Sequence, residues 1–151
     1  MSEEQKIVSA SRTVAASASA VFELIANPVK QPEWDGNDNL VEAPDSQRIT
    51  AAGQTFDMHT TMGNVRRNHV VEFEEGRRIA WQPSEVEGAP FGHLWRWELE
   101  PLAEGQTRVT HTYDWSQLTD EKRFARARWT TSERLMASVD RLAAQAESGT
   151  A

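Results

Sequence analysis

The chain of 151 residues contains no cysteine. This absence excludes disulfide bonds, thiolate catalysis and every zinc site built on cysteine ligands. Basic side chains are outnumbered, because 16 lysines and arginines stand against 23 aspartates and glutamates, which gives a formal net charge of −7. Nucleic acids and anionic membranes are bound through clustered basic side chains, so the sequence predicts neither as a partner.

Long apolar runs are also absent. The mean hydropathy is −0.63, and no stretch approaches the roughly 20 apolar residues that a membrane-spanning helix requires. The first six residues lack the basic and then apolar order of a secretory signal. We therefore expect a cytoplasmic protein without membrane insertion. The length is typical of a single domain, here taken as residues 1–151.

Motifs for phosphate, metal or nucleophile chemistry are missing. The sequence contains no Gly-x-Ser-x-Gly nucleophile elbow and no glycine-rich phosphate loop. Asp35 and Asp38 lie close together, but the glutamate that ends a calcium-binding loop does not follow them. We therefore expect neither a cofactor nor a metal ion.

The hydrophobic pattern predicts one strand, two short helices, about six further strands and one long helix. The first strand covers residues 7–14, and a short helix covers 18–26. Asn27 and Pro28 can begin a second short helical piece. Most of residues 38–116 alternates between apolar and polar side chains, which is typical of an antiparallel sheet with one solvated face.

The last predicted element is a long amphipathic helix. Residues 119–147 contain neither proline nor glycine, and Thr119 is suited to cap a helix at that point. Short disordered tails are expected outside a core of about residues 6–146. An α+β fold follows, in which a curved antiparallel sheet of about six to seven strands wraps around one unbroken helix over 119–147. A cavity between the sheet and this helix is a natural ligand site.

Five segments also carry a family resemblance. They are residues 15–28 (AASASAVFELIANP), 32–36 (PEWDG), 70–81 (VVEFEEGRRIAW), 97–101 (WELEP) and 105–115 (GQTRVTHTYDW). In their order and spacing they resemble the START-like (SRPBCC) superfamily of polyketide cyclase/dehydrase-type proteins, over roughly residues 6–146. The resemblance implies the helix-grip fold also known from Bet v 1-like proteins, with an internal hydrophobic pocket. Members of this superfamily include aromatase/cyclases, lipid carriers, hormone-binding proteins and chaperone co-activators, and the fold does not choose among them.

Tryptophan is abundant, with six residues against one tyrosine. Trp81, Trp95, Trp97 and Trp115 fall on the predicted inner face of the sheet, together with Tyr113. Indole rings form a rigid wall for a flat apolar ligand and offer an N–H donor. The same rings could equally fill a core, so both interpretations stay open.

Three histidines share the predicted inward phase. These are His69, His93 and His111, whereas His59 faces the other way. A buried imidazole can act as a general acid or base, or it can be a core histidine bonded to a neighbour. A metal site of three histidines is not favoured, because no pair has a short ligand spacing and no inward carboxylate orients them.

Arg128 is the least ordinary residue of the predicted long helix. On a helical wheel it falls inside the apolar stripe with Phe124, Thr131 and Leu135. One interpretation is that its guanidinium group holds a polar end of a ligand. The other is that it pairs with Glu121 on the same helix.

Three functions follow as hypotheses. The first is binding of a small, largely apolar, ring-containing molecule. The second is a polyketide cyclase, aromatase or dehydratase without a cofactor, for which His69, His93, His111 and Arg128 are the catalytic candidates. The third is a protein-interaction or chaperone co-activator role, and a homodimer is possible. The candidate ligand-binding residues are Met58, His69, Trp81, His93, Trp95, Trp97, His111, Tyr113, Trp115, Phe124, Arg128 and Leu135.

Overall fold

Alternating apolar and polar residues form the seven antiparallel strands of one sheet. A computed structural model describes residues 5–44 and 46–148. The elements in chain order are β1 (Ile7–Val14), α1 (Ala18–Ala26), the 3₁₀ turn η1 (Pro28–Lys30), α2 (Gln31–Trp34), β2 (Leu40–Glu42), β3 (Thr55–Thr60), β4 (Val65–Glu74), β5 (Arg78–Ser84), β6 (Leu94–Pro101), β7 (Thr107–Asp114), the 3₁₀ turn η2 (Glu121–Arg123), α3 (Phe124–Trp129) and α4 (Ser132–Ser148).

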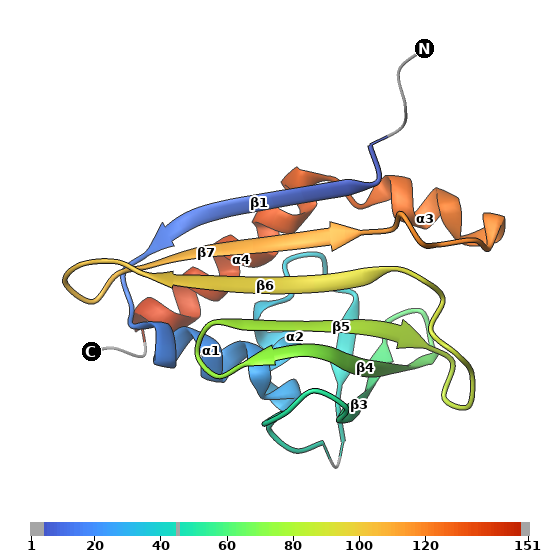
Figure 1. Ribbon diagram of the computed structural model, residues 1–151, viewed down its shortest axis with the longest axis horizontal. Coiled ribbons are helices and arrows are strands. Elements are labelled where there is room, and N and C mark those ends of the chain that lie inside the picture. Colours follow the sequence, from blue (N-terminus) through green and yellow to red (C-terminus); the bar gives the residue numbers. More distant parts are fainter. Residues whose placement is uncertain (1–4, 45, 149–151) are drawn as a thin grey trace.

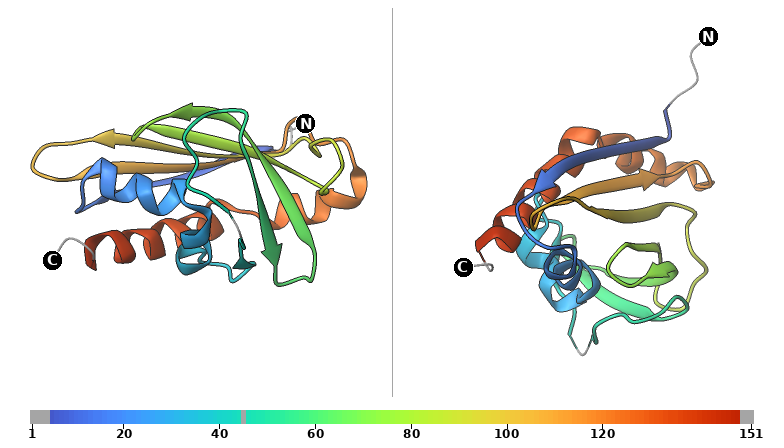
Figure 2. Two further views of the ribbon diagram at one scale, coloured as in Figure 1. Left: turned by 90° about the horizontal axis from the view of Figure 1, so that it is seen from below. Right: turned by 60° about the vertical axis from the view of Figure 1, so that its left-hand side comes forward.

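The sheet has the order β1-β7-β6-β5-β4-β3-β2, so the first strand pairs with the last. It is strongly curved, and α1, α2 and α4 lie on one side of it (Figures 1 and 2). The predicted α+β class and helix-grip arrangement are therefore confirmed.

The two short helices after β1 begin at side-chain caps that the sequence indicates. Ser17 Oγ accepts a hydrogen bond from the backbone N–H of Ala20 at 3.2 Å, which starts α1. Asn27 Oδ1 accepts one from Val29 N at 3.2 Å, with Pro28 at the first position of η1. The chain then continues into α2, which ends at Trp34.

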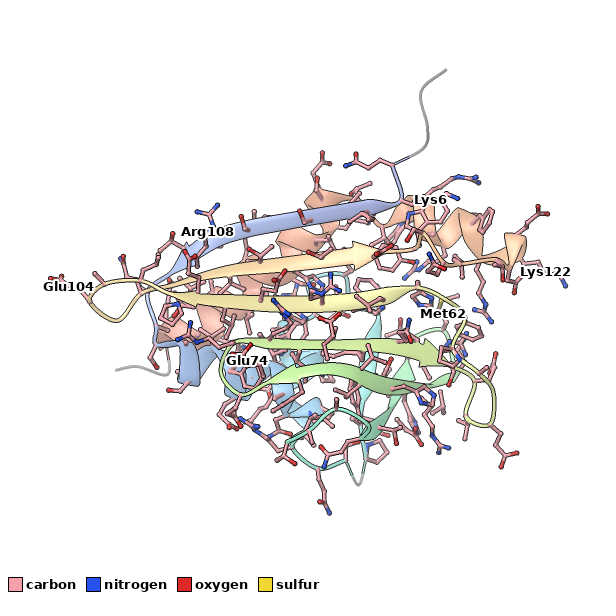
Figure 3. The ribbon with its side chains drawn as sticks, in the orientation of Figure 1. Lys6, Met62, Glu74, Glu104, Arg108 and Lys122 are labelled. Atoms are coloured by element: carbon pink, nitrogen blue, oxygen red, sulfur yellow. The ribbon has the colours of Figure 1, made fainter. Side chains whose placement is uncertain are left out.

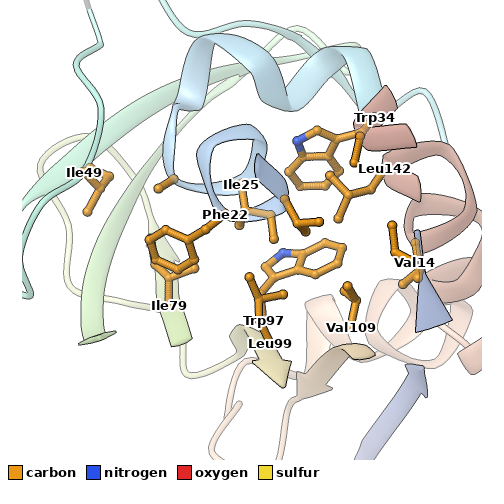
Figure 4. Close-up of a cluster of buried hydrophobic side chains, with 14 of the residues drawn as sticks. Val14, Phe22, Ile25, Trp34, Ile49, Ile79, Trp97, Leu99, Val109 and Leu142 are labelled. Carbon is orange, nitrogen blue, oxygen red and sulfur yellow. The ribbon is translucent and has the colours of Figure 1, made fainter. Parts of the chain in front are cut away.

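Trp97 is the centre of the core between α1, α4 and the sheet (Figure 4). Its side chain is fully buried. The ring of Trp34 meets it edge-to-face at 5.1 Å between centroids, and His111 stacks on it at 3.7 Å. Phe22 and Leu142 complete the packing from the two helices. Burial of aromatic and aliphatic surface of this size is the main source of stability here.

The prediction of one unbroken helix over residues 119–147 is wrong. The segment forms η2, α3 and α4, and the chain is extended at Thr130, with φ −83° and ψ 93°. Thr130 Oγ1 donates to the carbonyl of Arg126 at 3.1 Å, and Thr131 Oγ1 accepts from Arg134 N at 3.4 Å. The two threonines thus close one helix and cap the next, because short hydroxyl side chains compete for backbone groups. The first turn is capped by Asp120 rather than by Thr119.

The predicted tails fall mostly outside the described residues. Residues 1–4 and 149–151 lie beyond them, whereas Ser148 still belongs to α4. Among the helices of the described residues, none combines the length and the apolar character needed to cross a bilayer.

Gly36 fixes the distance between the end of α2 and α4. A Cβ atom at this position would lie 2.3 Å from the backbone carbonyl carbon of Ala137. The backbone N–H of Gly36 donates to Ser138 Oγ at 3.0 Å across the same contact. Only glycine therefore allows the two backbones to approach so closely.

We predict that Gly36→Ala lowers the free energy of unfolding by about 1–3 kcal/mol, because the added methyl group overpacks the contact with α4. Urea denaturation followed by tryptophan fluorescence measures this change. Gly88→Ala is the control, since its Cβ would meet only the Glu85 side chain, at 3.3 Å, in an exposed loop. Equal effects of the two substitutions would contradict the proposed role of the contact.

Candidate functional site

A cavity of about 400 Å³ lies between the concave face of the sheet and the helices α2, α3 and α4. Eight of the predicted ligand-binding residues line it: Met58, Trp81, His93, Trp95, Trp97, His111, Tyr113 and Leu135. They come from the strands β3, β5, β6 and β7, from the residue before β6, and from α4. The alternation of inward side chains along these strands brings them together.

The wall of the cavity is a continuous set of aromatic contacts. Trp95 packs on Tyr113 at 4.4 Å between ring centroids and on His111 at 5.6 Å. His111 in turn stacks on Trp97. His93 meets the edge of Tyr113 at 5.8 Å and is stacked on Phe91. Each ring holds the next in place, so the wall is rigid and largely apolar.

The cavity opens toward one end of the molecule. Most lining residues are buried or half-buried, but Met62, Lys122 and Arg126 are exposed. Met62 belongs to the turn between β3 and β4, and Lys122 to η2. Figure 3 shows both toward the end of the molecule opposite Glu104, which lies at the β6–β7 turn. We call this opening, between the β3–β4 turn and α3, the mouth of the cavity.

Both histidines of the wall are neutral at physiological pH. Burial lowers the pKa of His111 from 6.5 to about 3 and that of His93 to about 4, where the positive charges of Arg123 and Arg66 add to the effect of burial. His111 Nδ1 lies 3.1 Å from the carbonyl oxygen of Arg96, so its proton is on Nδ1. Burial also raises the pKa of the Tyr113 hydroxyl above its usual range.

His69 was predicted to face inward, and this is wrong. It lies on the opposite face of β4, where its Nε2 is 2.8 Å from Ser84 Oγ. The inward residues of this strand include Asn68 and Val70, which pair with Pro83 and Trp81. A register shift between Val70 and Glu72 inserts one residue, so that the inward phase changes along the strand.

Trp115, Phe124 and Arg128 do not line the cavity. Trp115 and Phe124 pack on each other at 5.5 Å in a second core cluster beyond the end of β7. The guanidinium group of Arg128 lies 5.5 Å from the ring of Phe124, and the residue is exposed. The prediction failed because it placed α3 and α4 on one helical wheel, whereas the break at Thr130 gives each its own phase.

Several lining residues escaped the sequence prediction. Trp34 and Asn68 contribute to the wall, and five basic residues, Arg66, Lys122, Arg123, Arg126 and Arg134, surround the mouth. The helix-capping pattern Thr-Thr-Ser-Glu at 130–133 could have predicted the break between two helices. With this break, Arg126 and not Arg128 is the inward arginine.

Asp35 is the one carboxylate among the described lining residues. Its oxygens accept hydrogen bonds from the backbone N–H groups of Asn37, Asn39 and Leu40 at 2.6–3.2 Å. It therefore shapes the loop after α2. Within residues 5–44 and 46–148, no group of three or more His, Asp or Glu side chains could hold a metal ion. The expected absence of metal and cofactor stays a prediction.

Comparison with known proteins places this geometry in a family. The sequence profile described as "Polyketide cyclase / dehydrase and lipid transport" matches residues 5–147. The chain belongs to this family. The resemblance drawn from the sequence motifs is thereby confirmed for nearly the whole chain. The family name covers both catalysis and transport, so it assigns no single activity to this chain.

The chain is also similar to curated proteins of Mycobacterium tuberculosis. The uncharacterised protein Rv0088 of Mycobacterium tuberculosis is 29% identical over 119 residues, which cover 72% of this chain and 47% of the relative. The chain thus spans about half the length of the curated relatives it matches.

Solved structures share the fold. Protein NE0264 from Nitrosomonas europaea aligns with a TM-score of 0.73 at 16% identity, covering 98% of both chains. A START superfamily protein from Mycobacterium smegmatis aligns with a TM-score of 0.66 at 15% identity, covering 94% of this chain and 97% of its own.

The lowered histidine pKa values predict a pH-dependent stability. The unfolded chain binds protons at His93 and His111 below pH 6.5, whereas the folded protein does not until about pH 4 to 3. The contribution of the two histidines to the free energy of unfolding is therefore fully present above pH 6.5. It is lost as the pH falls through this window, by up to about 1.4 kcal/mol per pH unit for each histidine.

Urea denaturation at pH 7, 6 and 5 tests this expectation, at pH values above the usual range of the carboxyl groups. His111→Gln should flatten the dependence, because it removes one of the two buried imidazole rings. A wild-type stability that does not fall between pH 7 and 5 would refute the neutral state of the two buried rings.

Proposed function

We propose that this protein binds a small, largely apolar, ring-containing molecule in the cavity between the sheet and α4. The observation that carries the proposal is the aromatic wall made by Trp95, Tyr113 and His111, which borders an unfilled volume of about 400 Å³. Ligand cavities in proteins have volumes of roughly 300–1,000 Å³. Flat rings stack on such a wall at low entropic cost, because its side chains are already held in place.

Polar atoms in the wall give the proposed ligand a defined orientation. His93 Nδ1 and Trp97 Nε1 are buried and have no hydrogen-bond partner among the described residues. A buried polar atom without a partner costs about 1–3 kcal/mol. A ligand with one or two oxygen atoms next to its rings would therefore suit this wall better than a plain hydrocarbon.

Cyclase, aromatase or dehydratase chemistry is the second candidate function. It is favoured by the neutral imidazole of His93, whose ring lies 5.8 Å from that of Tyr113 between centroids, since cyclisation of a polyketone needs proton transfers. A pKa of about 4 makes His93 a weak base near neutral pH, and efficient acid–base catalysts have pKa values near the working pH. This argument favours binding over catalysis. The protein-interaction role, the cytoplasmic location and the possible homodimer stay predictions.

The binding proposal is tested with phenyl-naphthylamine, a neutral dye made of a naphthyl and a phenyl group, which fluoresces in apolar surroundings. We expect one dye molecule to bind per chain, with energy transfer from the tryptophans. Trp95→Phe removes part of the wall and should weaken binding by about three- to tenfold, the scale of a lost aromatic contact.

Trp115→Phe is the matched control, because Trp115 is buried at 2% exposure but lies outside the cavity. Its affinity for the dye should equal that of the wild type. The proposal fails if the dye does not bind, or if both tryptophan variants weaken its binding equally.

A further inference from the structure

The mouth of the cavity is basic although the chain is acidic. Five cationic residues line the cavity, Arg66, Lys122, Arg123, Arg126 and Arg134, in a protein with a formal net charge of −7. The described lining residues include one carboxylate, Asp35, and backbone N–H groups of the following loop occupy its oxygens. The cations of the mouth therefore do not serve to neutralise acidic groups of the cavity.

These basic residues differ in whether they have an acidic partner. Arg66 and Arg123 both approach Glu85 at 3.5 Å, and Arg123 also approaches Asp120 at 3.4 Å. Arg126 and Arg134, in contrast, form no ion pair with any carboxylate among residues 5–44 and 46–148. Two guanidinium groups at the mouth thus lack a direct ion pair, and the charge of Asp35 acts on Arg126 only from a distance.

Both of these guanidinium groups contact the ring of Trp129. The Arg126 Cζ atom lies 3.9 Å from the centroid of the Trp129 ring, and the Arg134 Cζ atom lies 3.6 Å from it. Burial lowers the pKa of Arg126, and the charge of Arg134 lowers it further. A guanidinium group that packs face-on against an aromatic ring keeps its N–H groups in its own plane, parallel to the ring, so its edge stays available to an oxygen ligand.

We propose that the ligand is a ring-containing organic acid, whose carboxylate or similar oxyanion binds Arg126 and Arg134 at the mouth while its rings lie on the wall near Trp95. This inference rests on the proposed function and names the class of ligand. An anion at this position relieves the repulsion between the two guanidinium groups. Tyr113 of the wall lies within electrostatic reach of the mouth, because burial raises the pKa of its hydroxyl and the charge of Arg126 opposes this rise.

Two dyes that differ in one charged group test the inference. Anilinonaphthalene sulfonate is phenyl-naphthylamine with one added sulfonate group, so the two dyes share their aromatic body and differ in one oxyanion. We expect the double variant Arg126→Gln/Arg134→Gln to bind the sulfonate at least about tenfold more weakly, the scale of a lost charge-assisted hydrogen bond, and to bind the neutral dye within about twofold of the wild type.

Arg128→Gln is the control, because it removes one arginine charge from α3, the helix that carries Arg126, at a residue outside the cavity. It should leave both affinities unchanged. Displacement of the neutral dye by the sulfonate shows that the two share one site. Should the double variant fold poorly in urea denaturation, the wild-type protein suffices: raising the salt concentration from about 20 to about 500 mM should weaken the sulfonate and not the neutral dye.

The outcomes separate this inference from the proposed function. If the neutral dye binds and the sulfonate shows neither the loss in the double variant nor the salt dependence, the anionic ligand is refuted and the cavity function stands. The contacts of Trp129 with Arg126 and Arg134 then only stabilise the packing of α3 on α4. In that case the double variant should have a lower free energy of unfolding and unchanged affinities for both dyes. If neither dye binds, the cavity function itself is refuted, and this inference with it.

Discussion

The position of α4 against one edge of the curved sheet is the constraint on which the cavity depends. Its main strand contacts are with β1 and β7, and on its other side it packs against α1 and α2. Arg12 reaches Asp140 at 2.8 Å, and the backbone N–H of Ala15 donates to Glu147 at 2.9 Å, which tie β1 to the helix. With α4 held there, strands β3 to β5 curve away from it, and the space between them is not filled.

The break at Thr130 completes the cavity. In a straight helix from η2 to the end of α4, Arg126 and Arg134 would lie on one continuous helix axis. The extended residue Thr130 instead ends α3, which lies past the end of β7 (Figure 1). Trp129, just before the break, then contacts side chains from both helices. The local departure from helical periodicity thus produces the chemically distinctive part of the site.

Alternation along the strands made most of the fold and the apolar wall predictable. The segments of β6 and β7 show a strict period of two, so their inward residues, such as Trp97 and Tyr113, were identified correctly. The prediction failed where one residue changes the phase. Because of the register shift after Val70, Asn68 lines the cavity in place of the predicted His69. Because of the cap at Thr131, Arg126 lines it in place of the predicted Arg128. An alternating pattern does not reveal an inserted residue, because apolar and polar side chains alternate on both sides of it and only the face on which they lie changes.

The three ionisable rings of the wall share a property that matters for any molecule they receive. Burial moves the pKa of His93 and of His111 down to about 4 and 3, and it moves that of Tyr113 upward from 10.0. None of the three changes its protonation between about pH 5 and 10, so the wall presents the same pattern of donors and acceptors throughout this range. The acidity of the bound molecule, rather than that of these rings, then governs how its affinity varies with pH.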